Sequence, residues 1–198
     1  MKILITAFEP FGERSVNASL QVLDGIVNEI GQHQIFKRTL RVDHVEAPTQ
    51  LKSFLVEIQP DAVICLGEAG GSDYIRLEFV AINWMDFRIP DNAGKTMTDL
   101  RIIEGDRNAY FSTLPLRKFE SRLKEKGIPV KISMTAGTYL CNQVFFTLMQ
   151  YLDSIQVEIP AGFIHLPAEI MGDEAGSKDC DLELCVKGVD LILEMLVS

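Results

Sequence analysis

The sequence has little cysteine, little histidine and no long apolar run. Only four cysteines and three histidines occur among 198 residues, too few for the disulfide framework of a small secreted domain, and no two cysteines form a C-x-x-C pair. No apolar run reaches the roughly 18 residues that a transmembrane helix needs, and the apolar start of the chain is too short for a secretory signal. We therefore expect reduced thiols, no metal site, no membrane contact and a cytoplasmic protein.

Basic residues are also scarce. The 19 lysines and arginines face 28 aspartates and glutamates, which gives a formal net charge of −9 and a pI of about 4.8. A chain this acidic repels phosphate backbones, and no basic cluster overrides the net sign, so nucleic acid is not an expected partner. Hydrophobic residues make up 47% of the chain and charged residues 24%, which is typical of a globular domain, and the length predicts a single domain over residues 1–198.

Strands and helices alternate along the chain. We expect strands at 1–7, 34–42, 62–66, 75–88, 130–134 and 162–166, and helices at 17–31, 51–58, 115–126, 141–152 and 181–197. Most of these strands are too apolar to be half exposed, which favours a sheet covered on both faces. The pattern therefore predicts an α/β fold, a single-domain three-layer α/β/α sandwich around a mostly parallel twisted sheet.

Chemistry in such folds is expected beyond the carboxyl ends of the strands, here in the loops after Ala7, Leu66, Met134 and Leu166. Cys141 follows the third of these loops and lies at the predicted start of a helix. Free N–H groups and the helix dipole favour a thiolate there, as a nucleophile requires. The plainer alternative is that Cys141 is a small buried residue.

A base and an acid are available to support this cysteine. His165 lies at the end of a predicted strand and could take the thiol proton, although a histidine between Ile and Leu is more often a core residue. Glu78 lies on an apolar strand face, where a carboxylate needs a partner. That partner could be His165, whose ring it would orient, or Arg76 two residues earlier.

The remaining histidines and cysteines are not expected to carry chemistry. His33 and His44 have polar neighbours and are interpreted as surface residues. Cys185 is expected in the core of the last helix and Cys180 in contact with solvent. The glycine-rich segment at 67–71 lacks G-x-G-x-x-G and any lysine, so it does not indicate a nucleotide site.

Five blocks of sequence, in order, resemble the type I pyroglutamyl peptidases, also called pyrrolidone-carboxylate peptidases. The blocks are 8–12 (FEPFG), 77–83 (LEFVAIN) with 88–92 (RIPDN), 109–115 (AYFSTLP), 135–142 (TAGTYLCN) and 162–167 (GFIHLP). Members are cysteine peptidases that remove an N-terminal pyroglutamate from peptides. The resemblance implies Cys141 as nucleophile, His165 as general base and acid, and Glu78 as the group that orients His165.

The resemblance also implies a pocket for the lactam ring. Phe8 and Phe11 would line it, and the Cys141 N–H with nearby Arg88 would stabilise the oxyanion. Ordinary loop packing of the two rings, and a salt bridge from Arg88 to Asp86 or Asp91, are the alternatives.

The sequence departs from the family pattern at several positions. It has Ala7 where glycine is usual, Glu68 beside the pocket where several members have glutamine, and Phe79 where arginine is usual. The segment after Pro167 is short and lacks Tyr-x-Pro.

The function predicted from these features is a cysteine exopeptidase, or omega peptidase. It would hydrolyse the bond after an N-terminal pyroglutamyl residue through a thioester, without metal or organic cofactor. Its partners would be peptides with N-terminal pyroglutamate, and family members often form dimers or tetramers. Two alternatives stay open: a thiol-dependent amidase of another small amide, and a pyroglutamate-binding module without turnover.

Overall fold

The computed structural model describes residues 1–12, 14–168 and 180–198. A seven-stranded sheet runs through the centre in the order β2-β3-β1-β4-β9-β5-β8. Its strands are β1 (Lys2–Phe8), β2 (Glu29–Ile30), β3 (His33–Leu40), β4 (Ala62–Ala69), β5 (Ile75–Glu78), β8 (Val130–Ser133) and β9 (Ala161–Pro167). Four neighbouring pairs are parallel and two, β2 with β3 and β5 with β9, are antiparallel. The mostly parallel sheet is confirmed.

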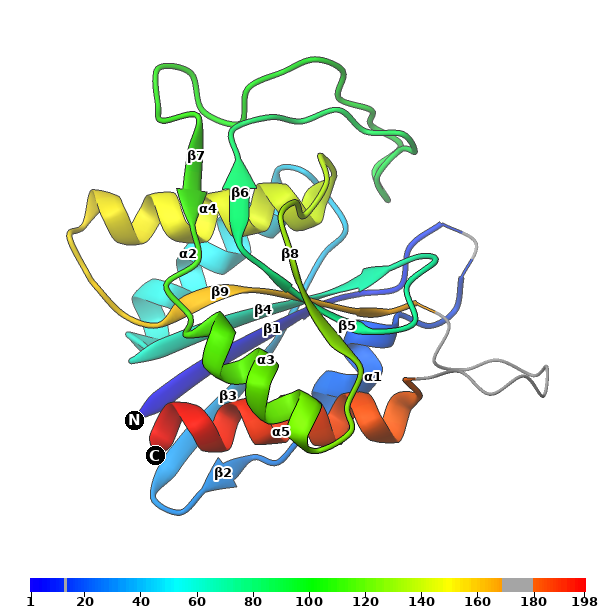
Figure 1. Cartoon of the computed structure of the whole chain (residues 1–198). Helices are drawn as coiled ribbons and strands as arrows, with labels where there is room; N and C mark the ends of the chain where they lie inside the picture. The colour runs from blue at the N-terminus through cyan, green and yellow to red at the C-terminus, as the bar shows by residue number, and fades with distance from the viewer. Residues whose placement is uncertain (13, 169–179) are drawn as a thin grey trace.

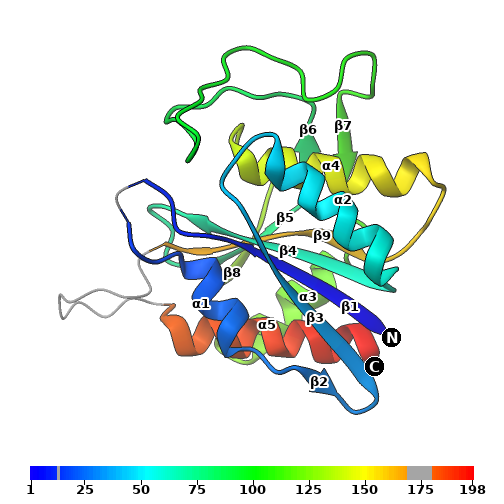
Figure 2. The same ribbon diagram turned by 180° about the vertical axis from the view of Figure 1, so that it is seen from behind.

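Helices cover both faces of this sheet (Figures 1 and 2). The helices α2 (Glu46–Ile58) and α4 (Leu140–Ser154) lie on one face, and α1 (Ala18–Gly25), α3 (Leu116–Glu125) and α5 (Leu182–Val197) lie on the other. Each face has its own hydrophobic core, one built with residues of α1, α3 and α5 and the other with residues of α2 and α4. The predicted three-layer α/β/α sandwich is therefore confirmed. Among the described residues no helix is long and apolar enough to cross a membrane.

The predicted long strand at 75–88 is wrong, because the chain leaves the central sheet at Phe79. Residues before it form β5, while Val80–Ile82 form β6, which pairs with β7 (Ala109–Phe111) in a separate two-stranded sheet. Phe79 connects the two, since its N–H donates to the carbonyl of Ser133 and its own carbonyl accepts from Ser112 N–H. The expected alternation fails in β5 because both of its faces are covered, so Leu77 and Glu78 are both fully buried.

The first predicted helix is too long. It begins after Asn17, whose side chain accepts from Ser19 N–H as expected of an N-cap, but it ends at Gly25. Residues 29–30 pair instead as β2 with β3, and Gly31 is the left-handed turn residue of that hairpin, with φ of 59°. The helical spacing of Val27 and Ile30 was a coincidence of composition. Most of the short segment after Pro167 lies outside the described residues.

Candidate active site

Cys141 is the second residue of α4 and is half-buried. The N-cap residue Tyr139 has an extended backbone, and among the described residues no side chain caps the helix. Helix N-terminal N–H groups have no partner inside the helix, so this end has donors to offer to a ligand. The sequence prediction that Cys141 lies at a helix N-terminus is confirmed.

The route of the chain to this helix differs from the prediction. Strand β8 is parallel to β5, and β5 is antiparallel to β9, so β8 does not end at the edge where β1, β4 and β9 end. The segment 134–139 between β8 and α4 therefore has to carry the chain onward to the site. Gly137 makes this turn with φ of 80°, and its N–H donates to Thr135 Oγ1 at 3.0 Å.

Asn142, the residue after the cysteine, fixes the start of α4 against β6. Its side-chain oxygen accepts from Ile82 N–H at 2.9 Å, and its Nδ2 donates to the carbonyls of Ile82 at 2.9 Å and Trp84 at 3.0 Å. The side chain is fully buried. An amide that satisfies three backbone groups in and just after β6 leaves the helix start little freedom, so Cys141 has a defined position.

His165 lies beside Cys141 because of two neighbouring strands. It is in β9, paired with Gly67 of β4. A Cβ on Gly67 would lie 2.9 Å from Cys141 Sγ and 2.6 Å from the Phe163 ring, so only glycine leaves room for the sulfur at this place. Gly67 was missed in the sequence, although a glycine inside a strand is a signal of close approach.

Glu78 is the partner of His165. Its Oε1 lies 2.8 Å from His165 Nδ1, and both side chains are buried. The alternative partner, Arg76, instead donates from Nε to Ser72 Oγ at 3.1 Å. The three predicted side chains therefore lie in a row. The imidazole of His165 is between the Cys141 sulfur and the Glu78 carboxylate, and it contacts both.

The charges of this row keep His165 protonated. Burial, the largest single influence, works against the imidazolium, but the Cys141 sulfur and then the Glu78 carboxylate outweigh it and raise the pKa of His165 to about 9. An imidazolium beside a sulfur anion is the state in which a cysteine acts as a nucleophile.

A small pocket opens beside the cysteine. Its lining consists of Phe8, Phe11, Asn17, Val42, Glu68, Tyr139, Leu140 and Cys141. Three of the four residues predicted for substrate binding, namely Phe8, Phe11 and Glu68, are among them. Arg88 is exposed and lies outside this lining. Three aromatic rings, of Phe8, Phe11 and Tyr139, form part of the wall, and the ring centroids of Phe11 and Tyr139 are 6.4 Å apart.

The sequence was compared with protein families and with known proteins, and both comparisons point to cysteine peptidases of one family. The profile of the family described as pyroglutamyl peptidase matches residues 1–197. The chain belongs to the pyroglutamyl peptidase family. A pyrrolidone-carboxylate peptidase of Bacillus cereus (strain B4264) is 36% identical over 199 residues, which cover 99% of this chain and 93% of the relative.

Solved structures of the pyroglutamyl peptidase family share the fold. The pyrrolidone carboxyl peptidase from Thermococcus litoralis is 37% identical, covers 99% of this chain and 93% of its own, and superposes with a TM-score of 0.90. A mutant pyrrolidone carboxyl peptidase from Pyrococcus furiosus is 36% identical, and the match covers 100% of this chain and 98% of the other, with a TM-score of 0.91.

Glu68, one of the departures from the family pattern, does not point a free charge into the pocket. Its Oε1 pairs with Arg14, its Oε2 accepts from Ala18 N–H at 2.7 Å, and Arg14 also donates to the carbonyl of Ala168 at 2.9 Å. Burial, the largest influence, raises the pKa of Glu68, while the bonds from Ala18 and Arg14 act in the opposite direction. The carboxylate of this family member is thus already bound within the protein.

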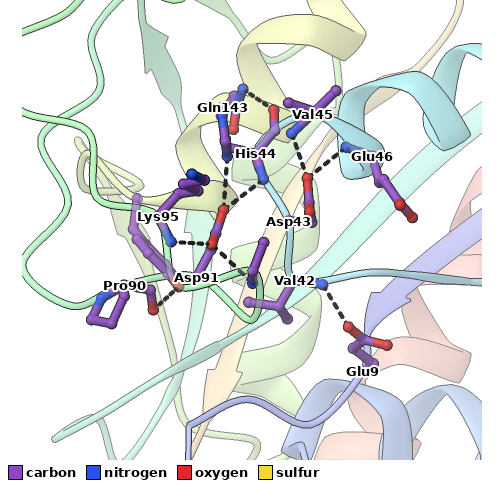
Figure 3. A network of polar contacts seen from close by, with 12 residues as sticks. Glu9, Val42, Asp43, His44, Val45, Glu46, Pro90, Asp91, Lys95 and Gln143 are labelled. Carbon is purple, nitrogen blue, oxygen red and sulfur yellow. Dashed lines mark hydrogen bonds and ion pairs between the residues drawn. The ribbon is translucent and has the colours of Figure 1, made fainter.

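A polar network holds the loops that carry the pocket (Figure 3). The buried Asp91 accepts from the N–H and the ring Nδ1 of His44, at 3.1 and 2.8 Å, and Gln143 Nε2 donates to the carbonyl of His44 at 2.8 Å. Tyr139 donates from its hydroxyl to the carbonyl of Pro90 at 3.1 Å. His44, interpreted from the sequence as a surface residue, is half-buried, with its side chain 20% exposed, and it joins the 88–95 loop to α4.

The 88–95 loop also contacts the segment 8–12, which carries Phe8 and Phe11. Asn92 donates from Nδ2 to Glu9 Oε1 at 3.1 Å and to the carbonyl of Pro10 at 3.0 Å. The neighbours of Phe8 and Phe11 are therefore tied to the loop that also contacts the start of α4. This interlocking was not predictable from the spacing of the residues in the sequence.

One group of residues in the described part of the chain has the composition of a metal site. Donor atoms of Asp43, His44 and Asp91 lie within 4.8 Å of one another. Asp43 Oδ1, however, accepts from the N–H groups of Val45 and Glu46, and Asp91 accepts from backbone donors besides His44. These oxygens serve the loops, so the group carries no metal assignment.

Proposed function

We propose that the chain is a cysteine exopeptidase, an omega peptidase that hydrolyses the amide bond after an N-terminal pyroglutamyl residue. The observation that carries the proposal is the row of Cys141, His165 and Glu78 at the edge of a pocket lined by Phe8 and Phe11. Relatives that match along nearly the whole chain bear the name of this activity.

The first half-reaction forms a thioester. The sulfur anion of Cys141 attacks the pyroglutamyl carbonyl carbon, and the carbonyl oxygen becomes an oxyanion. When the tetrahedral species collapses, the C–N bond breaks and the imidazolium of His165 gives its proton to the departing amine. Because Nδ1 of His165 is held by Glu78, the other ring nitrogen is the one available for this transfer.

The second half-reaction releases pyroglutamate. His165, now neutral, takes a proton from a water molecule, and the hydroxide attacks the thioester carbon. Collapse expels the Cys141 sulfur as an anion beside the imidazolium formed in that proton transfer, and the released acid ionises to pyroglutamate. A thiol and an imidazole can complete this cycle without metal or organic cofactor.

The oxyanion has donors at the start of α4. The N–H of Cys141 lies in the first turn of a helix that no side chain caps, where backbone donors and the helix dipole both favour negative charge. Arg88 was predicted to assist, but it is exposed and outside the pocket lining. In this proposal the backbone therefore supplies the oxyanion contact, and the role of Arg88 stays a prediction.

The pocket suits a flat, uncharged ring. Aromatic walls bind the faces of a five-membered lactam, and the pairing of Glu68 with Arg14 removes a free charge that would disfavour a neutral ligand. An uncyclised N-terminal glutamate carries two charged groups, and the lining offers neither of them a free opposite charge, because Glu68 is already paired with Arg14. We therefore expect discrimination in favour of the cyclised residue.

The test is release of a fluorogenic amine from its L-pyroglutamyl amide. The wild-type chain should hydrolyse it, Cys141→Ala should not, and Cys185→Ala, a matched cysteine substitution outside the pocket, should keep the activity. An inactive wild type or an active Cys141→Ala would refute the proposal. Rapid alkylation of Cys141 without hydrolysis would favour another thiol amidase, and affinity for free pyroglutamate without turnover would favour a binding module.

Two further parts of the proposal concern the setting of the enzyme. We place it in the cytoplasm, where its thiols stay reduced, as one domain over residues 1–198. We also expect a homo-oligomer, a dimer or tetramer, which sedimentation of the purified chain would test. A monomer at micromolar concentration would refute the second part.

A further inference from the structure

A second pair of sulfur-bearing side chains lies at the start of α5, outside the pocket lining. Cys180 and Cys185 have their Sγ atoms 3.3 Å apart, and both residues are buried, with 1% and 0% of their surface exposed. The expectation that Cys180 contacts solvent is therefore wrong. Both thiols are reduced in the structure, and their contact has no part in the proposed hydrolysis.

The contact follows from the way the helix begins. Asp181 is the N-cap of α5, and its side chain accepts from Leu184 N–H at 2.9 Å. Cys180 is then the residue before the cap and Cys185 the fourth residue of the helix. These are the two positions of a hydrophobic staple, in which an apolar residue before the cap packs on the fourth residue of the helix. Here both positions of the staple carry a thiol.

We propose that Cys180 and Cys185 form a modification site: a dithiol that a peroxide oxidises to an intrachain disulfide across the first turn of α5. The helix start already holds the two sulfur atoms in contact, so bond formation requires a closing movement of little more than 1 Å from 3.3 Å to a disulfide length of about 2.05 Å. The site takes a small uncharged oxidant, because both sulfurs lie in an apolar core.

The two sulfurs have different roles in this oxidation. The hydrogen bond from Cys185, the largest influence, lowers the pKa of Cys180, and the same bond together with burial raises the pKa of Cys185. Cys180 is therefore the sulfur that loses its proton first. Cys185 keeps its proton and remains next to it as the resolving thiol.

The step balances with hydrogen peroxide as the oxidant. The Cys180 thiolate attacks one peroxide oxygen, an S–O bond forms, the O–O bond breaks, and hydroxide leaves, which gives a sulfenic acid. The Cys185 sulfur then attacks the Cys180 sulfur, the S–S bond forms and the S–O bond breaks. The departing hydroxide takes the thiol proton as water, so two thiols and one peroxide give one disulfide and, with the proton Cys180 gave up, two waters.

The other cysteines provide internal controls. Cys65 is equally buried, and burial, the largest influence, raises its pKa to about 12, so it should stay reduced. Cys141 is half-buried and should be oxidised by peroxide on its own. The variant Cys141→Ser removes this competing reaction and leaves the staple unchanged.

The experiment uses the full chain carrying Cys141→Ser, treated with hydrogen peroxide, denatured, alkylated with iodoacetamide without reductant and digested with trypsin. Cleavage after Lys178 and Lys187 releases both staple cysteines in one peptide, 179–187. We expect this peptide two hydrogen atoms lighter than its dithiol form and without alkyl groups, and it should become doubly alkylated after dithiothreitol. The peptide with Cys65 should be alkylated throughout.

Three results would overturn the proposal. They are a 179–187 peptide that stays doubly alkylated after peroxide, a sulfinic acid at Cys180 in place of the disulfide, and a disulfide-linked dimer on a non-reducing gel. Cys180→Ser should leave Cys185 as an alkylatable thiol, whereas Cys185→Ser, which lacks the resolving thiol, should retain a sulfenic acid at Cys180. The oxidised Cys141→Ser chain should also unfold about 4 °C higher than the reduced one, and equal midpoints would contradict a staple that constrains the helix start.

Discussion

The N-termini of α4 and α5 both involve cysteine, but they are completed in opposite ways. At α5 the Asp181 side chain accepts from Leu184 N–H, and Cys180 and Cys185 close over the first turn. At α4 no side chain caps the helix, and Cys141 is half-buried beside a pocket. At a capped end the N–H donors bind side chains of the protein and stabilise the fold. At the uncapped start of α4 they are available to a ligand, and of the two sites only this one has a histidine beside its cysteine.

The N-terminus of α1 is a third helix end near these sites, and like that of α5 it is capped by side chains. Asn17 caps it through Ser19 N–H, and the Glu68 carboxylate accepts from Ala18 N–H. Both of these capping side chains also line the pocket. The pocket thus lies between one helix end that is closed by polar side chains and another, that of α4, which is left open to the substrate.

The largest effect is expected from removing His165, the residue that Cys141 has beside it and that Cys180 and Cys185 lack. Replacing His165 with Asn should lower hydrolysis of a pyroglutamyl amide by about 10³-fold or more, because the general acid and base is removed. It should also slow iodoacetamide alkylation of Cys141 at neutral pH, because the sulfur anion loses its imidazolium partner. Peptide mass spectrometry measures each cysteine separately.

Cys180 and Cys185 serve as the reference in that experiment. Their alkylation in the folded chain should be slow in both the wild type and His165→Asn, because they are buried and have no imidazole partner. A Cys141 that alkylates at the same rate with and without His165 would show that the open helix end alone activates the thiol, and would remove the histidine from the explanation.

The second effect is on pH dependence. The pKa of His165 is raised to about 9, chiefly by Cys141 and then by Glu78 against the opposing effect of burial. The leaving amine needs the imidazolium proton, so kcat/KM should fall as pH rises through about 9. Glu78→Gln removes one of the two charges that hold this proton. We expect its alkaline limb to move to lower pH, with kcat reduced by about 10²-fold.

A pH profile of wild type and Glu78→Gln between pH 5 and 10.5 checks this. The sign is fixed, because removing a negative charge can only lower the pKa of a neighbouring imidazolium. An alkaline limb that stays in place, or moves upward, would mean that Glu78 only supports the fold. Equal thermal midpoints of the two proteins would show that the kinetic change does not come from unfolding.

The third effect concerns the closed helix end. Asp181→Ala removes the cap of α5, so the free energy of unfolding should fall by about 1 kcal/mol and the midpoint by roughly 2 to 4 °C. The kcat and KM for a pyroglutamyl amide should stay unchanged, because α5 does not contribute to the pocket lining. Thermal unfolding and steady-state kinetics measure the two quantities. A large loss of kcat at an unchanged midpoint would contradict the division between the two helix ends.

The sequence predicted what depends on local pattern and on side-chain type. Hydrophobic spacing predicts the alternation of strands and helices, although it misses β2, β6 and β7 as separate strands. Cys141, His165 and Glu78 stand out because a thiol, a base and a buried acid have recognisable surroundings. Their contact was an inference from strand ends, and it was right although β8 runs opposite to β9. The reason is a turn at Gly137, whose effect on the path of the chain no periodicity reveals.

What the sequence could not provide are contacts between segments far apart. The partner of Glu68 is Arg14, and Asp91 binds His44, because tertiary packing brings these loops together. Phe79 looked like one more residue of an alternating strand, yet it joins two sheets. Cys180 is expected to be exposed because it lies five residues before Cys185 and so on another helix face, but it is buried because it precedes the N-cap of α5 and packs onto Cys185.

The smallest expected effect comes from Glu68, which closes one helix end and borders the pocket at the same time. Glu68→Gln keeps an oxygen acceptor for Ala18 N–H and loses the charge that pairs with Arg14. Since the Arg14 side chain is 43% exposed, solvent screens this pair, and we expect KM to change by less than about threefold.

The pH dependence of this difference tests where the charge of Glu68 acts. Burial, the largest influence, raises the pKa of Glu68, so it protonates before an exposed glutamate does as pH falls. A protonated Glu68 is as uncharged as the glutamine, and any difference in KM between the two proteins should therefore shrink toward acidic pH. A difference in KM that grows toward acidic pH would show that Glu68 acts on the substrate directly. It would contradict the view that its carboxylate is held by Arg14 and the start of α1.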